Sequence, residues 1–541
     1  MISTPASPES KDVLDLAKQL FESNERRNFE SQWDIQAQYL LPMQSGIFFG
    51  NNLSEGDKKT DNLLYSEGVL SNQDLAASLH STLTNPATEW AKLKFTDDEL
   101  NQDEESKIWL EDSVKRMHKA FNDSNFDTEM ASNYQIFTAL GSMSLQHESL
   151  PLKPDGTFGG FFFKGWHLAN LAVMENQWGV VDTIVRKFKY TAKQAKERWE
   201  SLPDKIRETE DVNVKFDFIQ VIRPRKSFKG DPTALILPVD EMPFENIVVE
   251  KDSGMVVERG GYMEFPNHFT RWGVLAGETY GRGPGHHVIP DVRTLNKLIE
   301  MGMTSLAIGI APPILSTRRN IVSNLRLKPN GLTIVRNLND ITQMQSQARG
   351  DFYQFTRDDY VQSIRRGFFL DKLLLPPRED VGEMTAFEIA RRIEQMQRVL
   401  GPTFGRLNKE ALQPLVLRSF KMMLRQNAFK ELPPMVREFG INVDISFINQ
   451  LARSQRVEEL NAINQYVQTA GFLAQFNPDA ADTFDVDKAM AVVGEVVGLP
   501  EAISPSDNEK KAKRDARNEQ QQALAEAQIN QTNADAQSKL R

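Results

Sequence analysis

The stretch from Gly277 to Asn296, GETYGRGPGHHVIPDVRTLN, contains residue types that could hold a phosphate. Four glycines, an arginine and two adjacent histidines stand immediately before a helical pattern. Backbone amides at the start of a helix attract anions, and glycine allows the backbone to approach a ligand closely. A site of this kind, built on Gly281 to His287, would indicate a nucleotide-dependent enzyme.

The spacing of these glycines differs from that of known phosphate-binding loops. A dinucleotide-binding fold requires G-x-G-x-x-G after a strand, whereas Gly281, Gly283 and Gly285 follow the pattern G-x-G-x-G. Pro284 also removes a backbone N–H that a phosphate would need. No P-loop motif, G-x-x-x-x-G-K-S/T, occurs in the chain. The alternative interpretation is a hinge, in which the glycines supply unusual backbone angles and Pro284 stiffens the loop.

Other catalytic and metal-binding patterns are missing from the sequence. Cysteine is absent, which excludes disulfides, thiolate metal sites and cysteine nucleophiles. His286 and His287 are adjacent, so their side chains point apart on a helix or strand, and no H-E-x-x-H motif occurs. No G-x-S-x-G nucleophile elbow occurs either. We therefore expect a protein that is not an enzyme and that binds no metal and no cofactor.

The overall charge argues against a protein that coats nucleic acid by bulk attraction. The 541 residues carry 64 lysines and arginines against 74 aspartates and glutamates, a formal net charge of −10. One segment, 311–350, departs from this balance because it has six basic residues and a single acid, Asp340. It is either a solvated basic loop or a contact for phosphates or an acidic partner. The basic residues are Arg318, Arg319, Arg326, Lys328, Arg336 and Arg349.

No segment is expected to insert into a membrane or to direct export. The most apolar run, LAIGIAPPIL at 306–315, has about half of the ~20 residues that span a bilayer, and two prolines interrupt it. The first residues, MISTPASPESKDVLDL, lack a basic segment followed by an apolar run. A chain of this length should form two to four structural units.

The periodicity of apolar residues predicts a mainly α-helical chain with an α+β body. Residues 11–39 and the segment with Leu75, Leu79 and Leu83 have apolar residues at helical spacing. Short apolar runs between 155 and 265 predict strands, with one helix in YTAKQAKERWESL.

Aromatic residues are concentrated in this strand-rich region. Trp166, Trp178, Trp199 and the phenylalanines 161–163 could form a surface on which bases stack. They alternate with other apolar residues in strand-like runs, so positions in the core are favoured.

The second half of the chain predicts long helices separated by short insertions. The insertion after the first helix should contain short strands, and the segment beyond residue 440 is again expected to be helical. The tail 506–541 has almost no large apolar residues, so it is either disordered or ordered by packing against copies of itself. The first two expected helices are Asp291 to Ile310 and Phe352 to Leu374. A third, very long helix should begin at a capping box formed by Thr385 and Glu388 and should be kinked at Gly401, Pro402 and Pro414.

Several stretches occur in the order in which one known family has them. Together with the order of elements (α+β body, helix, basic insert, helix, loop, long kinked helix, polar tail), they resemble the portal proteins of short-tailed, podovirus-type bacteriophages, also called head-to-tail connectors. The stretches are WDIQAQYLLP with Trp33, Tyr39 and Pro42, LAASLHSTLTNPATEWAKL, NYQIFTALGSMSLQHE, GYMEFPNHFTRW leading into GETYGRGPG, and MTAFEIARR.

The resemblance implies a ring-forming architecture with wing, stem, clip and crown. The ring usually has twelve subunits and stands at one capsid vertex, where a separate terminase drives DNA through its axis and the tail attaches. On this mapping the segments are the wing (1–290, with the long kinked helix 385–440), the first stem helix (291–310), the clip (311–350), the second stem helix (351–375), the tunnel loop (376–384), the crown (441–505) and the polar C-terminal tail (506–541), a possible helical barrel or disordered.

The resemblance also implies site residues in three segments. In the tunnel loop they are Pro376, Pro377, Arg378, Glu379, Asp380 and Glu383, which would face DNA in the channel. In the clip they are Arg318, Arg319, Arg326, Lys328 and Arg336, which would contact DNA, terminase or a tail adaptor. At the hinge between wing and stem they are Gly281, Gly283, Pro284 and Gly285.

The implied partners are further copies of the chain, the major capsid and scaffolding proteins, terminase, tail adaptor or nozzle proteins, and double-stranded DNA, with no membrane. The implied location is the portal vertex of the virion, after assembly in the host cytoplasm. Two other interpretations stay open from the sequence. One is a different virion ring, such as a tail adaptor, and the other is the nucleotide-binding cytoplasmic enzyme built on Gly281 to His287.

Overall fold

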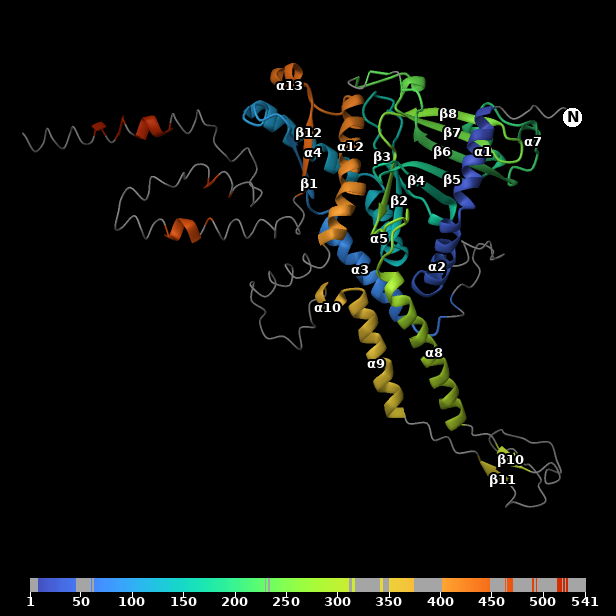
Figure 1. The fold of residues 1–541 in the computed structure, drawn as a ribbon. Helices are drawn as coiled ribbons and strands as arrows, with labels where there is room; N and C mark the ends of the chain where they lie inside the picture. Colours follow the sequence, from blue (N-terminus) through green and yellow to red (C-terminus); the bar gives the residue numbers. More distant parts are fainter. Residues whose placement is uncertain are drawn as a thin grey trace, which may run out of the picture. The chain divides into compact units, whose positions relative to one another are not determined.

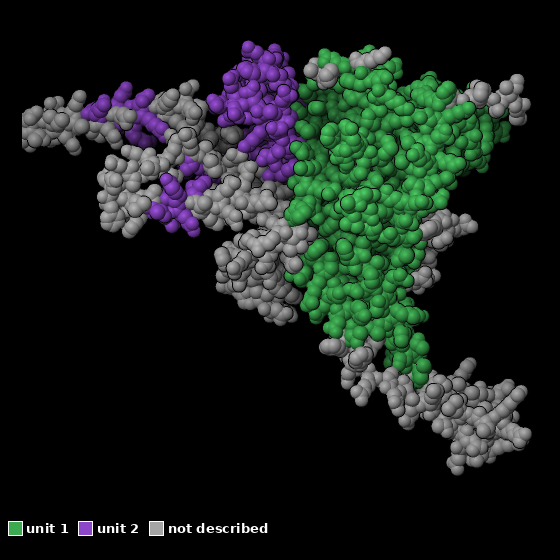
Figure 2. Space-filling model, viewed as in Figure 1, with its two compact units in different colours: residues 1–84, 121–425 green, residues 85–120, 426–541 purple. Residues whose placement is uncertain are grey.

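The computed structural model divides into two compact units (Figure 2). Unit 1 contains residues 1–84 and 121–425, and unit 2 contains residues 85–120 and 426–541. The structure describes residues 8–44, 60, 63–228, 230, 231, 234–310, 314–316, 341–343, 350–373, 401–447 and short pieces between 463 and 523.

A five-stranded antiparallel sheet is the largest sheet of unit 1 (Figure 1). Its strand order, β4-β5-β6-β7-β8, is also the order in sequence, as expected for short alternating runs separated by turn residues. Val185 lies opposite Val221, and Val221 lies opposite Ile247. The strands are β4 (Leu171–Glu175), β5 (Val181–Thr191), β6 (Lys215–Pro224), β7 (Phe244–Glu250) and β8 (Val256–Tyr262).

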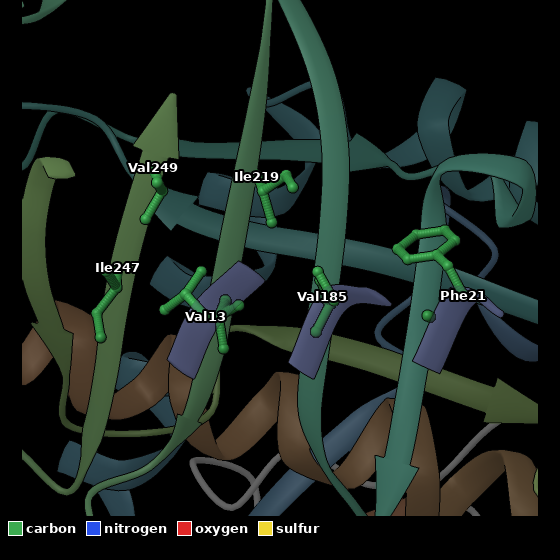
Figure 3. Close-up of a cluster of buried hydrophobic side chains, with 9 residues drawn as sticks. Val13, Phe21, Val185, Ile219, Ile247 and Val249 are labelled. Atoms are coloured by element: carbon green, nitrogen blue, oxygen red, sulfur yellow. The ribbon is translucent and has the colours of Figure 1, made fainter. Parts of the chain in front are cut away.

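Helix α1 (Pro8–Phe21) covers one face of this sheet. Val13, Ala17 and Phe21 are spaced four residues apart, so they lie on one side of the helix, and all three are buried. Figure 3 shows Val13 and Phe21 beside the strand residues Val185, Ile219, Ile247 and Val249. Burial of each large apolar side chain here contributes about 1.5–3 kcal/mol. The sheet residues in this cluster are Ala172, Val185, Ile219, Val221, Ile247 and Val249.

Two short helices, α6 (Ala192–Arg198) and α7 (Asp204–Arg207), supply the cover for the opposite face. Phe218 and Val248 alternate with the residues that face α1, so they point the other way and pack with Trp199. The predicted helix in YTAKQAKERWESL is confirmed as α6, and Thr191 closes its first turn in a capping box with Gln194.

The aromatic residues of this region divide between core and surface. Trp166, Trp199 and two of the three phenylalanines in 161–163 are buried, as predicted. The prediction of a core position is wrong for Trp178, which is 79% exposed, and for Phe162, which is 43% exposed. Trp178 lies in the turn between β4 and β5, beyond the last paired residues, and Phe162 points away from its buried neighbours on the strand.

A second, three-stranded sheet has the order β3-β2-β9. Its strands are β2 (Ser142–Ser149), β3 (Phe161–Gly165) and β9 (Asn267–Arg271). This sheet buries His147 and His268, whose rings are 5.8 Å apart, together with Arg418 of helix α12 (Gln413–Arg425). The Arg418 Nε donates to the carbonyl of His147 at 3.2 Å.

The remaining described part of unit 1 is mostly helical. Leu75, Leu79 and Leu83 are buried on one side of α3, as their spacing predicts. Helices α8 and α9 run antiparallel and side by side (Figure 1), and the hydroxyl of Ser363 donates to Asp291 Oδ2 at 2.6 Å. The helices are α2 (Asn24–Leu40), α3 (Glu67–Leu83), α5 (Phe126–Leu140), α8 (Pro284–Ile310), α9 (Gly350–Gly367) and α10 (Leu370–Leu373), with 3₁₀ turns at Pro42–Gln44, Leu168–Asn170 and Val239–Glu241.

The bounds of the long helices differ from those predicted. Helix α8 begins at Pro284 rather than Asp291, because Pro290 is accommodated inside the helix. The second helix stops at Gly367, since Phe369 adopts a positive φ of 59° before α10 starts. Between them the expected short strands are present as β10 (Ile314–Ser316) and β11 (Ile341–Gln343), which pair antiparallel. Among the described helices, none is long and apolar enough to cross a membrane.

The long helix predicted over 385–440 ends at Arg425. Its described part contains a π-helical turn at Asn408–Leu412, immediately before Pro414, where a kink was predicted.

Unit 2 contains helix α13 (Pro434–Phe439), a two-stranded sheet and most of helix α4 (Glu104–Asn122), whose last two residues belong to unit 1. The strands β1 (Ala91–Phe95) and β12 (Val443–Phe447) pair antiparallel, with Leu93 opposite Ile445. The prediction that the chain is helical directly beyond residue 440 is therefore wrong, because the alternation V-D-I-S-F matches a strand with one buried face. The indole of Trp109 donates to the carbonyl of Lys430 at 3.1 Å.

The two buried histidines should make unit 1 sensitive to acid. Burial lowers the pKa of His268 to about 3 and that of His147 well below its usual value, and Arg418 lowers both further. An unfolded histidine titrates near pH ~6.5, so below that pH the unfolded chain binds more protons than the folded chain. The free energy of unfolding should be fully retained above pH ~6.5 and should fall as the pH drops toward ~4, by up to about 1.4 kcal/mol per pH unit for each histidine.

Urea unfolding at several pH values would measure this slope. His268→Phe removes one titrating group and should reduce the slope by up to about 1.4 kcal/mol per pH unit. A His268→Phe protein with the full wild-type slope would contradict the assignment.

Candidate functional site

The glycine loop connects strand β9 to helix α8 in unit 1. Gly281 and Gly283 lie in the loop, and Pro284 and Gly285 are the first two residues of α8. Proline at the first helical position loses no hydrogen bond, because the first amides of a helix have no partner within it. All four residues of the predicted hinge therefore lie where the body meets the helix, and their role as a hinge stays a prediction.

These glycines touch the backbone at the end of helix α5. A Cβ on Gly281 would lie 2.3 Å from the carbonyl oxygen of Gly141, and one on Gly283 would lie 2.9 Å from the Gly141 Cα. A Cβ on Gly285 would lie 2.0 Å from the carbonyl oxygen of Ala139. Two backbone segments therefore cross with no room for a side chain between them.

The predicted reason for the glycines is wrong. None of Gly281, Gly283 and Gly285 has a positive φ, whereas Gly277 and Gly141 do, at 84° and 78°. The three loop glycines are required for space, whereas Gly277 adopts a backbone angle that favours glycine and Gly141 is required for both reasons. Close contact of backbone with backbone fixes the direction in which α8 leaves the body.

The amides of the loop are already used inside the fold. Gly281 N–H donates to Ser142 Oγ at 2.9 Å, and Arg282 N–H donates to the carbonyl of Gly273 at 2.7 Å. Gly283 N–H donates to His286 Nδ1 at 3.2 Å. A phosphate cradle needs amides that point at the ligand, so the amides of Gly281, Arg282 and Gly283 are not available to a nucleotide.

The charged and imidazole groups of the loop are also engaged. Arg282 forms a two-pronged ion pair with Glu278, with both N–O distances 2.7 Å. Burial lowers the pKa of His286 to about 4, with the Arg282 charge adding to the shift, so the ring is neutral at pH ~7 and can accept from Gly283. Among the residues that the structure describes, no three histidine, aspartate or glutamate side chains are grouped to hold a metal ion.

An aromatic cluster anchors the loop to helix α2. The rings of Tyr280 and Trp33 meet edge to face at 5.2 Å, and the Trp33 indole donates to the carbonyl of Leu140 at 3.0 Å. The fully buried Arg26 guanidinium lies 4.9 Å from the centre of the Trp33 ring and donates to the carbonyl of Leu168 at 2.7 Å. Trp33, one of the residues that carry the family resemblance, therefore helps to hold this loop against the body.

A buried arginine, Arg271, ties the loop to three other segments. Its guanidinium donates to the carbonyls of Thr279 in the loop, at 3.2 Å, and of Gly179 in the β4–β5 turn, at 2.9 Å. It also pairs with Glu175 and with Glu410 of the π-helical turn, at 2.7 Å for Glu410. Burial alone lowers the pKa of Arg271, but its hydrogen bonds to Glu410 and Glu175 raise it above the usual value.

Sequence reasoning missed Arg271, Glu410 and Arg26. Arg271 lies in the stretch GYMEFPNHFTRW, which carries the family resemblance, but the sequence does not show its partner, because Arg271 and Glu410 are separated by 139 positions. The physical signal at Arg271 is that an arginine ends a fully buried strand, where an unpaired charge would be costly.

The other predicted site residues cannot be placed. The tunnel-loop residues within 376–384 and the clip residues within 318–336 lie outside the described part of the chain. Their roles stay predictions.

Gly285→Ala should destabilise unit 1 by about 2–3 kcal/mol, because its new methyl group would meet the Ala139 carbonyl in a backbone contact that cannot relax cheaply. Gly405→Ala is the matched control, since no atom lies near its added methyl group and the residue is helical. The control should be neutral or stabilised by about 0.5–1 kcal/mol. Denaturant unfolding measures both, and equal stability of Gly285→Ala and wild type would show that the crossing is looser than described.

Arg271→Met should destabilise unit 1 by about 3 kcal/mol, because it leaves Glu410 and Glu175 without their shared cation in a mostly buried place. Glu410→Gln should cost less, and the double variant should cost less than the sum of the two. Arg207→Met, which breaks the exposed pair with Asp204, is the control and should stay within about 0.5 kcal/mol of wild type. Strict additivity of the Arg271 and Glu410 changes would contradict the pairing.

Similar proteins were found over nearly the whole chain. The model of the family "bacteriophage head to tail connecting protein" matches residues 11–504. A probable portal protein of Bordetella phage BPP-1 is 27% identical over 532 residues, covering 95% of this chain and 93% of its own. The portal protein of Salmonella phage epsilon15 is 26% identical over 520 residues, covering 91% of this chain and 89% of its own.

Solved structures were also found. The virion of the native gene transfer agent particle matches with a TM-score of 0.37 at 11% identity, over 80% of this chain and 90% of that one. The neck of the native particle computed with C12 symmetry matches with a TM-score of 0.35 at 11% identity, and the match covers 86% of this chain and 99% of that one. The match of the family model to residues 11–504 confirms the resemblance stated from the sequence, and the chain belongs to the bacteriophage head-to-tail connecting protein family.

Proposed function

We propose that this chain is a phage portal protein that forms a ring at one vertex of the capsid. Genomic DNA passes through the ring during packaging and ejection, and the tail attaches to it. The observation that carries the proposal is the family match over residues 11–504, together with two relatives named as portal proteins that align with 95% and 91% of the chain.

The portal architecture of wing, stem, clip and crown is part of this proposal. Helices α8 and α9 fall in the proposed stem (291–310 and 351–375), and they lie side by side and antiparallel (Figure 1). The pairing of β10 with β11 brings together the two ends of the proposed clip, 311–350. The other segments keep the assignment from the sequence, with the tunnel loop at 376–384.

Ring formation is supported by the far end of α8. Residues 301–310 contain no charged side chain, and Met301, Met303, Leu306 and Ile310 are all more than half exposed. Met301 and Leu306 stand on different sides of the helix, so a single covering surface cannot bury both. A subunit in a cyclic ring meets a neighbour on each side, so a ring of this chain, proposed to have twelve members, can cover both.

The charge of the chain supports a channel through which DNA slides. A net charge of −10 disfavours tight binding to phosphates, which would hold the DNA in place. We assign DNA contact to the tunnel loop, and contact with DNA, terminase or a tail adaptor to the basic residues of the clip. The capsid and scaffolding proteins are the further proposed partners, and the portal vertex of the virion is the proposed location after assembly in the host cytoplasm.

Membership of the head-to-tail connecting protein family favours a protein without catalytic activity. The one loop that suggested nucleotide chemistry uses its amides and its arginine within the fold. In this proposal the energy for DNA movement comes from the terminase.

Native mass spectrometry and negative-stain electron microscopy of the purified full-length chain test the proposal. The expected result is a closed ring of about twelve subunits with a central hole. A protein that stays monomeric at high concentration and across a range of salt would overturn it. Cryo-electron microscopy of the particle separates the portal from another ring, because a portal lies inside the capsid vertex and a tail adaptor lies below it.

A further inference from the structure

Helices α8 and α9 each have one buried side. On α8 the buried residues are Val288, Val292, Leu295 and Ile299, all 6% exposed or less. On α9, Ile364 is fully buried, and Arg365 pairs with Glu67 of α3. The opposite sides of both helices face away from these contacts and carry charge.

The outer side of α8 is basic. Arg293 and Lys297 are exposed, and each lies two residues from the buried Leu295, which places it roughly 160° around the helix from Leu295. Lys297 has a local partner in Glu300 at 2.7 Å, yet its side chain remains 67% exposed. The three side chains together carry one net positive charge.

The outer side of α9 is acidic in the part that precedes Ser363. Arg366 is also exposed on this side, about 4.5 Å beyond Ser363 in the opposite direction along the helix. Asp358 and Asp359 are exposed, and both lie roughly 120–140° around the helix from the buried Ile364. Asp358 has a local partner in Arg357 at 2.7 Å, and its side chain remains 59% exposed. These three residues carry one net negative charge.

The two charged groups lie at the same level along the helix pair. The Ser363–Asp291 hydrogen bond fixes the antiparallel register. With a rise of ~1.5 Å per residue, Asp359 and Asp358 lie about 6 and 7.5 Å beyond this bond, and Arg293 and Lys297 lie about 3 and 9 Å beyond it. The acids of α9 are therefore level with the gap between the two cations of α8.

A rotation about the axis of a ring keeps every atom at its own height along that axis. If the helix pair runs roughly along the axis, as in a stem, groups that are level within one chain are level between neighbouring chains. The outer side of α8 and the outer side of α9 are different surfaces, as a head-to-tail ring contact requires.

We propose that α8 of each subunit docks on α9 of its neighbour, with Arg293 and Lys297 facing Asp358 and Asp359. This inference rests on the proposed ring and identifies its stem interface. The uncharged segment 301–310 begins directly after Glu300, and its side that continues the outer side of α8 is buried by the same contact. The charged groups set which surfaces meet and at what height, and the apolar end supplies most of the binding free energy.

Charge reversal tests the pairing. In Arg293→Glu/Lys297→Glu every stem interface would place acid against acid, and in Asp358→Lys/Asp359→Lys every interface would place base against base. Each variant should raise the protein concentration needed for half-assembly by about tenfold at low salt, and less at high salt, because two exposed pairs are lost. Analytical ultracentrifugation measures the ring fraction, and circular dichroism checks that the chains are folded.

Mixing gives a second test that does not depend on absolute stability. When the two variants are mixed in equal amounts, an alternating ring places acidic α8 against basic α9 and basic α8 against acidic α9. The mixture should recover wild-type assembly to within about threefold, and so should the variant that carries all four reversals. A matched control on α6, Lys193→Glu with Glu197→Lys, should leave assembly unchanged.

The outcomes separate this inference from the proposed function. If wild type forms rings and the two variants assemble as well as it does, or if neither the mixture nor the fourfold variant recovers, the pairing is wrong and the ring stands. If wild type forms no ring, the proposed function itself fails.

Discussion

The structure of unit 1 depends on a crossing of two backbone segments that leaves no space for a side chain. Gly141 ends helix α5 in the left-handed region, and Gly281 and Gly283 pass across it at distances that only glycine permits. Hydrogen bonds hold the two segments together at the crossing. The Gly141 carbonyl accepts from Trp272 N–H, and Gly281 N–H donates to Ser142 Oγ. Helix α8 starts at Pro284, directly after the crossing, so the crossing sets its direction.

Arg271 extends this constraint to the rest of the unit. One guanidinium binds the loop before α8, the β4–β5 turn and the π-helical turn at Glu410. Because the group is buried and each partner would be left with an unsatisfied charge or carbonyl, none of these segments can move alone without a large cost. In a portal, this arrangement would link the long helix that follows the tunnel loop to the helix that forms the stem.

The spacing of apolar residues and the capping residues predict much of the fold. They give the wrong result where a proline lies inside a helix or where a turn exposes an apolar side chain. The leucines of α3, the strands between 155 and 265 and helix α6 were readable because period and capping chemistry act within a few residues. The sequence predicts that α8 starts at Asp291, but it starts at Pro284, because Pro290 lies inside a helix that packs on α2, α3 and α9. The apolar strand context predicts a core position for Trp178, but the residue is exposed because it lies in the turn between β4 and β5.

The sequence by itself determined the family, the absence of known catalytic motifs and the position of the loop at the start of a long helix. These follow from residue types at short spacing and from their order along the chain. Only the tertiary structure decided why the loop is rich in glycine, and which residues hold it. Gly141 lies about 140 positions before the loop, and Glu410 lies 139 positions after Arg271. Contacts between residues so far apart leave no periodic trace in the sequence, because each depends on where the whole fold places a single backbone atom or charge.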